Sequence, residues 1–374
     1  MTTLQAQDSS QVRHFHLNGY MKFMTLGINS SNPDIFLDEQ FFHNRLEAQW
    51  TPLPGLEVNA ALRTRLFYGG LVRLNSDFGA MLSKEANDYF DLDRLIVNNQ
   101  KIVLHTVLDR LYAQYNIGKW EIAAGRQRIN WGIATLWNPN DIFNTYRFTD
   151  FDYEERPGSD ALRVTWYRSW NSSLELALKM AESLDSSVMA LRWKFGLGSY
   201  DVQGIVGKYY QKIMLGGGFA GNLGSGSLRG EFSVFIPDNA IAAKTNFSAT
   251  IEYQQSTRYN LLYTFGFLYN SSGGEQSILN LFDYTPSAEN LYPYAYSIFA
   301  QGNYTINPLL DCGLAVVYSA NKQHPAFISP VLSYSAAQNF DVNLTAQIIA
   351  ERDHTTHHYH SPLQAVYLRF KYSF

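Results

Sequence analysis

Basic residues separated by one position recur along the chain, and this spacing could form a surface that binds anions. Arg63 and Arg65 flank Thr64. Arg192 and Lys194 are spaced in the same way. In an extended strand, residues two apart point to the same side, and the planar guanidinium of Arg binds carboxylate or phosphate through two parallel N–H groups. Such rows could therefore pass anionic solutes from one guanidinium to the next.

The same alternation assigns a larger set of charged residues to one face of the expected strands. If these strands form a closed barrel, the residues expected to line its interior are Arg45, Arg63, Arg65, Arg110, Arg163, Lys179, Arg192, Lys194, Glu47 and Glu57, together with Arg229, Arg369, Lys371, Glu175, Glu231 and Glu252. Cations outnumber acids in this set although the formal net charge is −4, so the acids must concentrate in loops.

Two interpretations of the arginines remain open at this stage. The five in the first half of the chain could form a ladder that conducts anions. Alternatively, they form ion pairs with Glu47 and Glu57 and only hold neighbouring strands in register.

Histidines gather near the end of the chain, as His354, His357, His358 and His360. Imidazoles this close could bind a divalent transition metal, but no regular spacing fixes their geometry, which favours a polar loop rich in His. The sequence has no Gly-x-Ser-x-Gly elbow and no phosphate-binding loop, and the single cysteine, Cys312, has no partner for a disulfide or a metal site. We therefore expect no enzymatic activity, no metal and no cofactor.

The composition points to a membrane protein that does not cross the bilayer with helices. Aromatic residues make up 15% of the 374 residues and charged residues 17%, below the quarter typical of soluble domains. Tyr and Trp suit a membrane interface, because the ring can lie in lipid while its polar edge stays hydrated. No stretch approaches the roughly 18 apolar residues of a spanning helix, and the mean hydropathy is −0.22. The net charge gives no reason to expect nucleic acid as a partner.

Alternation of apolar and polar residues over about ten positions, followed by turn residues, recurs almost from end to end, as in the strands of a transmembrane β-barrel. Tight turns are expected near residues 52–56, 116–119, 169–173, 196–201, 222–227, 256–260, 306–309 and 336–340. Longer connections are expected at residues 69–101, 132–159, 271–291 and 353–361. The pattern predicts an all-β fold, an antiparallel transmembrane barrel of about 18 strands, with short periplasmic turns and long extracellular loops.

Energy decides which face of each strand points inward. With the opposite phase, residues such as Arg45, Arg63, Arg110, Arg163 and Arg192 would point into lipid, at roughly 2–4 kcal/mol each near the midplane. Their sum would be comparable with the stability of an ordinary domain. The charged face must therefore line the interior.

The two ends of the chain carry weaker signals. Residues 1–11 contain no apolar signal-peptide core, so we expect an N-terminal tail left after signal removal, followed by one barrel domain over residues 12–374. The final strand alternates Phe370, Tyr372 and Phe374 with basic residues. This ending resembles the signal by which outer-membrane barrels are handed to the barrel-assembly machinery, and we expect these three residues to serve membrane insertion.

The segment Gly-Arg-Gln-Arg-Ile-Asn-Trp-Gly at 125–132, followed by Trp-Asn-Pro-Asn-Asp-Ile-Phe at 137–143, resembles a motif of porin-like Gram-negative outer-membrane β-barrel families. The resemblance implies that residues 132–158 form a loop that folds into the barrel and constricts it. The aromatic and acidic residues of this stretch suit that position; the candidate constriction residues are Trp137, Asp141, Asp150, Asp152, Glu154 and Glu155. The alternative is an outer loop packed on its neighbours as a lid.

These observations predict an integral outer-membrane porin for passive diffusion of small polar, anionic solutes. The expected partners are the bilayer with its lipopolysaccharide leaflet, the assembly machinery, the solutes and further copies of the chain. The alternatives are an export conduit for an anionic polysaccharide and a plugged barrel that binds a partner through its outer loops. Conductance separates the plugged barrel from the other two.

Overall fold

Antiparallel strands make up most of the computed structural model, which describes residues 14–31, 34–86, 88–144, 156–238, 244–274, 286–353 and 356–374. The strands are β1 (His14–Ser31), β2 (Asp34–Leu53), β3 (Leu56–Gly69), β4 (Asp93–Asn98), β5 (Ile102–Ile117), β6 (Trp120–Gln127), β7 (Ser159–Ser169), β8 (Ser172–Lys179), β9 (Val188–Leu197), β10 (Tyr200–Tyr209), β11 (Lys212–Leu223), β12 (Gly226–Pro237), β13 (Asn246–Ser256), β14 (Leu261–Asn270), β15 (Tyr296–Asn307), β16 (Leu310–Ser319), β17 (Ala326–Ala337), β18 (Phe340–Arg352) and β19 (Tyr359–Ser373).

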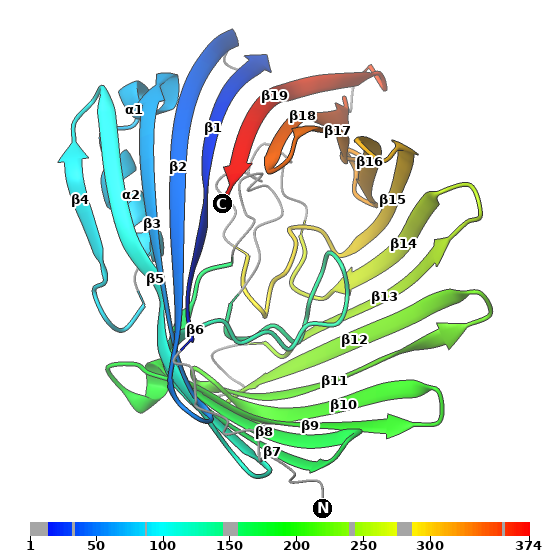
Figure 1. The fold of residues 1–374 in the computed structure, drawn as a ribbon. Helices are drawn as coiled ribbons and strands as arrows, with labels where there is room; N and C mark the ends of the chain where they lie inside the picture. Colours follow the sequence, from blue (N-terminus) through cyan, green and yellow to red (C-terminus); the bar gives the residue numbers. More distant parts are fainter. Residues whose placement is uncertain are drawn as a thin grey trace, which may run out of the picture.

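Each wall strand pairs with its neighbours in sequence, and β1 pairs with β19, so that the sheet closes on itself (Figure 1). The β4 strand pairs with β5 alone, beside the part of β5 that β6 does not reach. The ring around the barrel therefore has 18 strands, which confirms the predicted fold class.

Among the described residues, helices occur only in the connections between strands. The β3–β5 connection contains α1 (Gly70–Leu74) and α2 (Phe78–Ala86), and the β8–β9 connection contains the short 3₁₀ helix η1 (Leu184–Ser186). Among the described residues, no helix is long and apolar enough to cross a membrane.

The side chains of the wall strands alternate between an apolar outer face and a polar inner face. In β8, Leu176 is 45% exposed whereas its neighbours Glu175 and Ala177 are buried. In β1, Phe23 lies on the exposed face and Lys22, only 1% exposed, on the other. Apolar side chains exposed in this regular way suit contact with acyl chains.

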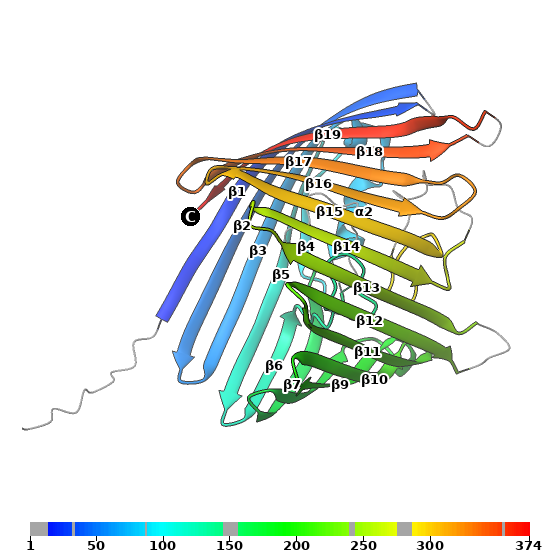
Figure 2. The same cartoon turned by 90° about the vertical axis from the view of Figure 1, so that its right-hand side faces the viewer.

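The connections at the two rims differ in length. All eight tight turns predicted from the sequence lie at one rim, together with the start of β1 and the end of β19 (Figure 2). Most connections at the other rim are longer, but β1 and β2 are separated by two residues, and so are β10 and β11. Two-residue links can join antiparallel strands at either rim, so the alternation of short and long connections is incomplete. In bacterial outer-membrane barrels the rim of tight turns usually faces the periplasm.

The last residue takes part in closing the barrel. The backbone N–H of Gly19 donates to the carbonyl of Phe374 over 3.0 Å, and the Phe374 N–H donates back over 2.9 Å. A Cβ on Gly19 would lie 2.3 Å from the Arg45 carbonyl oxygen and 3.0 Å from the Phe374 ring. Gly19 therefore allows the terminal aromatic ring to lie against the wall at the seam.

Candidate functional site

The chain leaves the wall after Gln127, four residues before the predicted start of the loop at 132. Gly125 has φ +118°, and a Cβ there would lie 2.3 Å from the Leu111 carbonyl oxygen, so glycine is required for the close approach of β6 to β5. The Gln127 side chain turns back and donates to the carbonyls of Ala123 and Ala161, each over 3.1 Å. These contacts fix the point at which the chain turns inward.

Arg126 occupies the gap in the wall where β6 stops. Its guanidinium forms two hydrogen bonds to the Asp160 carboxylate, over 2.9 and 2.8 Å. It also donates to the backbone carbonyls of Phe90, over 2.5 Å, and Leu108, over 3.4 Å. Both members of the ion pair are buried, at 2% and 0% exposure. The Arg126 guanidinium therefore connects β6 to β7, to β5 and to the connection that precedes β4.

From this gap, residues 128–144 run inside the ring (Figure 1). The indole of Trp131 donates to Glu175 of β8 over 2.5 Å, and the Arg192 guanidinium lies 5.2 Å from the centre of its ring. Gln203 of β10 donates to the Trp131 carbonyl over 2.8 Å. The segment thus begins by packing on the inner face of three consecutive hairpin strands.

Two carboxylates of the wall then hold the segment through its backbone. Glu231 of β12 accepts from the N–H groups of Ile133, Ala134 and Asn140. Glu252 of β13 accepts from those of Thr135, over 2.7 Å, and Leu136, over 3.2 Å. Hydrogen bonds to a charged acceptor are worth about 1.5–3 kcal/mol each. Glu231 and Glu252, which the sequence placed among the interior residues, anchor the segment.

Glycines in β11 make room for this close packing. A Cβ on Gly216 would lie 2.5 Å from Oδ1 of Asn140, and one on Gly218 would lie 2.9 Å from a side-chain carbon of Ile133. The Asn140 amide donates to the Gly217 carbonyl over 2.8 Å. The inward segment therefore packs directly on the glycine-rich stretch of β11.

A second segment, residues 286–295, meets the first inside the barrel. Trp137 packs against Tyr292 with ring centres 5.6 Å apart, and against Phe299 of β15 at 6.2 Å. These residues belong to a buried apolar cluster that extends to β18. Lys212 of β11 forms an ion pair with Glu289 of the second segment. Together the two segments cover the inner face from β8 to β15.

A group of cations on the inner face of strands outside this covered region forms what we call the basic arc. Its members are Arg369 and Lys371 of β19, Lys22 of β1, Arg45 of β2, Arg63 and Arg65 of β3, Arg110 of β5 and Arg163 of β7. Neighbouring strands bring them together: Arg45 lies directly opposite Arg63, and Lys22 opposite Lys371. The ammonium groups of Lys22 and Lys371 lie 5.1 and 4.7 Å from the centre of one ring, that of Tyr20.

A β-bulge decides the position of Arg110. The register between β3 and β5 shifts so that Ala61 lies opposite Arg110 while Leu62 lies opposite Leu108. The additional residue, Asp109, is buried beside Arg110, and its carboxylate forms an ion pair with Arg45. Without the bulge, two consecutive residues could not both face the interior.

The arginines divide between the two interpretations left open by the sequence. Arg45 pairs with Glu47 over 2.5 Å and with Asp109. Glu57 accepts instead from the Asn59 amide, over 2.6 Å. In the part of the chain that the structure describes, no ion pair involves Arg63.

The other predicted lining cations also have identified neighbours. Arg163 pairs with Glu121 over 2.7 Å, Arg192 with Glu175 over 2.8 Å, and Lys179 with Asp88 over 2.8 Å. Arg229 donates to the amide oxygen of Gln254 over 2.9 Å, and Arg369 to that of Asn343 over 3.1 Å. Lys194 lies in β9 on the inner-face phase of Arg192.

Asp141 connects the inward segment to the basic arc. Its carboxylate pairs with Arg156, whose carbonyl accepts from Arg110 over 2.5 Å. Burial raises the pKa of Asp141 to about 6, although Arg156 and Arg128 act to lower it. The other acids expected in the constriction, Asp150, Asp152, Glu154 and Glu155, lie outside the described residues.

The raised pKa of Asp141 predicts a pH-dependent stability. A folded pKa of about 6 against an ordinary 3.8 means that the folded chain binds the proton more tightly, so this contribution is complete below pH 3.8 and is lost as pH rises through 6. We expect Asp141→Asn to raise the urea midpoint at pH 8 more than at pH 5, measured by tryptophan fluorescence in detergent. An equal shift at both pH values would contradict the assignment.

The histidine group does not form a site in the described part of the chain. His357, His358 and His360 are exposed, and His354 lies outside the described residues. His360 lies 3.3 Å from Glu351. No cluster of three or more metal-ligating side chains occurs among the residues that the structure describes.

Sequence reasoning missed several of the residues that shape the interior. Arg126 and Gln127 belong to the motif at 125–132. The alternation within one strand does not show that β6 ends there or which residues of other strands these two side chains contact. Asp160 and Gln203 carry no local signal at all, because their partners are 34 and 72 residues away.

No family model matches the chain, and no curated protein does. Solved structures match over almost its whole length. OccAB4 of Acinetobacter baumannii has a TM-score of 0.64 at 9% identity, and the match covers 98% of this chain and 100% of the OccAB4 chain. OccK7 (OpdD) of Pseudomonas aeruginosa has a TM-score of 0.62 at 8% identity, and the match covers 96% of this chain and 98% of the OccK7 chain. The outer-membrane protein OpdK of the same organism has a TM-score of 0.59 at 9% identity, covering 96% and 98%.

At these identities the likeness concerns the fold. The closed ring of 18 strands and the apolar outer face agree with it. The chain is therefore a closed 18-strand β-barrel that shares the fold of these outer-membrane proteins.

Proposed function

We propose that the protein is a passive outer-membrane channel for small polar solutes, with a preference for anions. The observation that carries the proposal is the division of the interior. Two inward segments cover the inner face from β8 to β15, whereas the basic arc lies on the strands from β19 through β1 to β7. Solutes that pass between them would meet cationic side chains on one side, and a charged wall in a narrow aqueous space selects by sign.

The charges of the basic arc support a net positive potential there. Arg63, which lies directly opposite Arg45, has no ion pair among the described residues. On the covered side, Glu231 and Glu252 are occupied by backbone N–H groups of the inward segment. Their negative charge is therefore enclosed by donors and contributes less to the open path.

Single-channel recording in a planar bilayer tests the proposal. With a tenfold KCl gradient, we expect a reversal potential that indicates anion preference, and anions of graded size would separate a channel for small solutes from a conduit for an anionic polysaccharide. Cation preference would refute the anion assignment. An absence of conductance would instead support a plugged barrel that acts through its outer loops.

The variant Arg63→Gln/Arg65→Gln should reduce the preference for anions. Two like charges a few ångströms from a passing ion are each worth about 1 kcal/mol even in water-like surroundings, so the permeability ratio should fall by about fivefold or more. Arg258→Gln is the matched control, because Arg258 is exposed in a periplasmic turn and stacks on Tyr259 at 4.8 Å. An equal change in both variants would mean that net charge, rather than the basic arc, sets the selectivity.

A further inference from the structure

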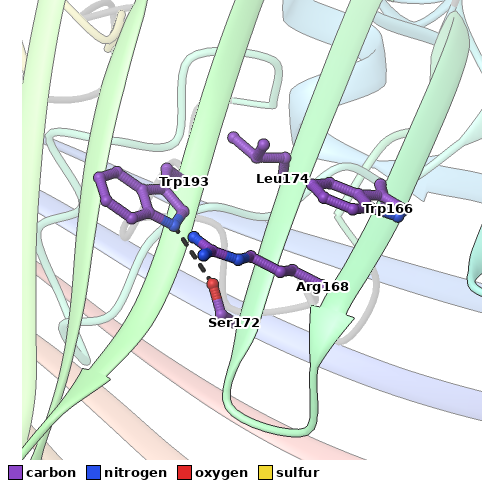
Figure 3. A pocket seen from close by; sticks show the side chains of 5 residues that line it. All are labelled: Trp166, Arg168, Ser172, Leu174 and Trp193. Carbon is purple, nitrogen blue, oxygen red and sulfur yellow. Dashed lines mark hydrogen bonds between the residues drawn. The ribbon is translucent and has the colours of Figure 1, made fainter.

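A pocket of about 270 Å³ lies on the outer face of the barrel, beside the tight turn between β7 and β8 (Figure 3). Its lining residues are Trp166, Arg168, Ser172, Leu174 and Trp193. The pocket is separate from the interior, because these residues belong to the outward phase of β7, β8 and β9. A role in solute passage therefore does not explain it.

The floor and sides of the pocket come from one row across three strands. Trp166 lies directly opposite Leu174, and Leu174 directly opposite Trp193. One leucine is thus flanked by two larger indoles, which leaves a slot over its side chain. Toward the middle of the barrel the next outward pair on β8 and β9 is Leu176 and Leu191, both exposed. A pocket of this volume with an apolar floor fits part of an acyl chain, and the exposed leucines extend the apolar surface along the strands.

Arg168 stands at the end of the slot nearest the turn. Figure 3 shows its side chain extending across the hairpin toward Ser172 and Trp193. It is exposed, and among the described residues no ion pair involves its guanidinium. The inner-face arginines of the same strands, Arg163 and Arg192, each pair with a glutamate. Arg168 therefore presents its N–H groups to the surroundings of the barrel.

The depth of Arg168 matches the level of lipid phosphates. It lies two residues beyond Trp166, about 7 Å along the strand, and indoles concentrate at the boundary between acyl chains and headgroups. A second cation is close by, since the Lys119 ammonium donates to the Arg168 carbonyl over 3.4 Å. Guanidinium groups bind phosphate through paired charge-assisted hydrogen bonds.

We propose that this pocket binds one phospholipid of the inner leaflet of the outer membrane. The Arg168 guanidinium holds the phosphodiester, supported by the charge of Lys119. One acyl chain lies over Leu174 between the two indoles. The occupant is a lipid rather than free phosphate, because the slot offers an apolar floor that an inorganic anion cannot use. The site does not depend on whether the barrel conducts.

Native mass spectrometry of the whole protein in neutral detergent tests the site with dioleoylphosphatidylglycerol as the probe. We expect one molecule to bind more strongly than any further ones. Arg168→Gln should weaken this first binding by about tenfold, the value of one charge-assisted contact of roughly 1.4 kcal/mol. Arg258→Gln, which removes the same charge at the same rim, should bind as the unchanged protein does. Each variant is first checked for heat-modifiable gel mobility, so that a folding defect is recognised.

Two further measurements separate the slot from the charge. Trp193→Leu should also weaken the first binding event, because the slot loses one side while Arg168 remains. Dioleoylglycerol, which lacks phosphate, should bind no better to the unchanged protein than to Arg168→Gln, and excess inorganic phosphate should not displace the phospholipid. Equal phospholipid binding by Arg168→Gln and the unchanged protein would refute the site, as would an equal loss in Arg258→Gln.

Discussion

Replacing Arg126 with alanine is expected to lower the free energy of unfolding by about 3–5 kcal/mol, the usual consequence of removing one member of a buried ion pair. The change leaves the Asp160 carboxylate, which is 0% exposed, without its guanidinium. It also removes the donor for the Phe90 and Leu108 carbonyls in the gap of the wall. Urea unfolding in detergent, followed by tryptophan fluorescence, measures the loss.

An exposed ion pair provides the comparison. Lys208 and Asp185 lie 3.5 Å apart with side chains 35% and 69% exposed, and such pairs contribute about 0–1 kcal/mol. Lys208→Ala should therefore shift the urea midpoint little. If Arg126→Ala and Lys208→Ala gave similar midpoints, the buried pair of Arg126 and Asp160 would not stabilise the wall. Asp160→Ala should resemble Arg126→Ala, because it leaves the opposite charge buried.

The double variant Glu231→Gln/Glu252→Gln is expected to release the inward segment and raise the single-channel conductance. The two carboxylates accept from five backbone N–H groups of residues 133–140. A neutral amide is a weaker acceptor, and its NH₂ group faces donors. A loss of about 3 kcal/mol in the hydrogen-bond free energy that holds the segment would change the ratio of bound to released segment by roughly 150-fold. We expect larger and more variable current steps than in the unchanged protein.

Glu57→Gln is the matched control for this experiment. Glu57 lies on the inner-face phase of β3 and accepts from Asn59, and among the described residues it has no hydrogen bond or ion pair with residues 128–144. The substitution Glu57→Gln removes a negative charge from the interior while leaving the inward segment bound to Glu231 and Glu252. Unchanged conductance in the double variant, or the same increase in Glu57→Gln, would show that the anchors do not restrict the path.

Much of the architecture could be read from local patterns. The two-residue period placed Arg63, Arg65 and Arg192 on the polar face. Turn residues between the alternating segments located all eight tight turns and predicted about 18 strands, the number found in the ring. These features depend on neighbours along one strand, and the large cost of a charge in lipid leaves a single allowed phase.

The interior depended on contacts between residues far apart in the sequence. Ile133 meets Glu231 across 98 positions, and Thr135 meets Glu252 across 117. No period within either strand reveals that these carboxylates hold a segment rather than face a solute. The bulge at Asp109 likewise became visible only from the register between β3 and β5.

The sequence thus determined that the chain is a barrel with a charged interior and an apolar exterior, because each strand carries that information in its own alternation. Where residues 128–144 run inside the barrel, which charges they neutralise and how the gap after β6 is filled were decided by the assembled ring. Those outcomes follow from hydrogen-bonding groups that become neighbours when the sheet closes, and an isolated strand cannot specify its partners across the barrel.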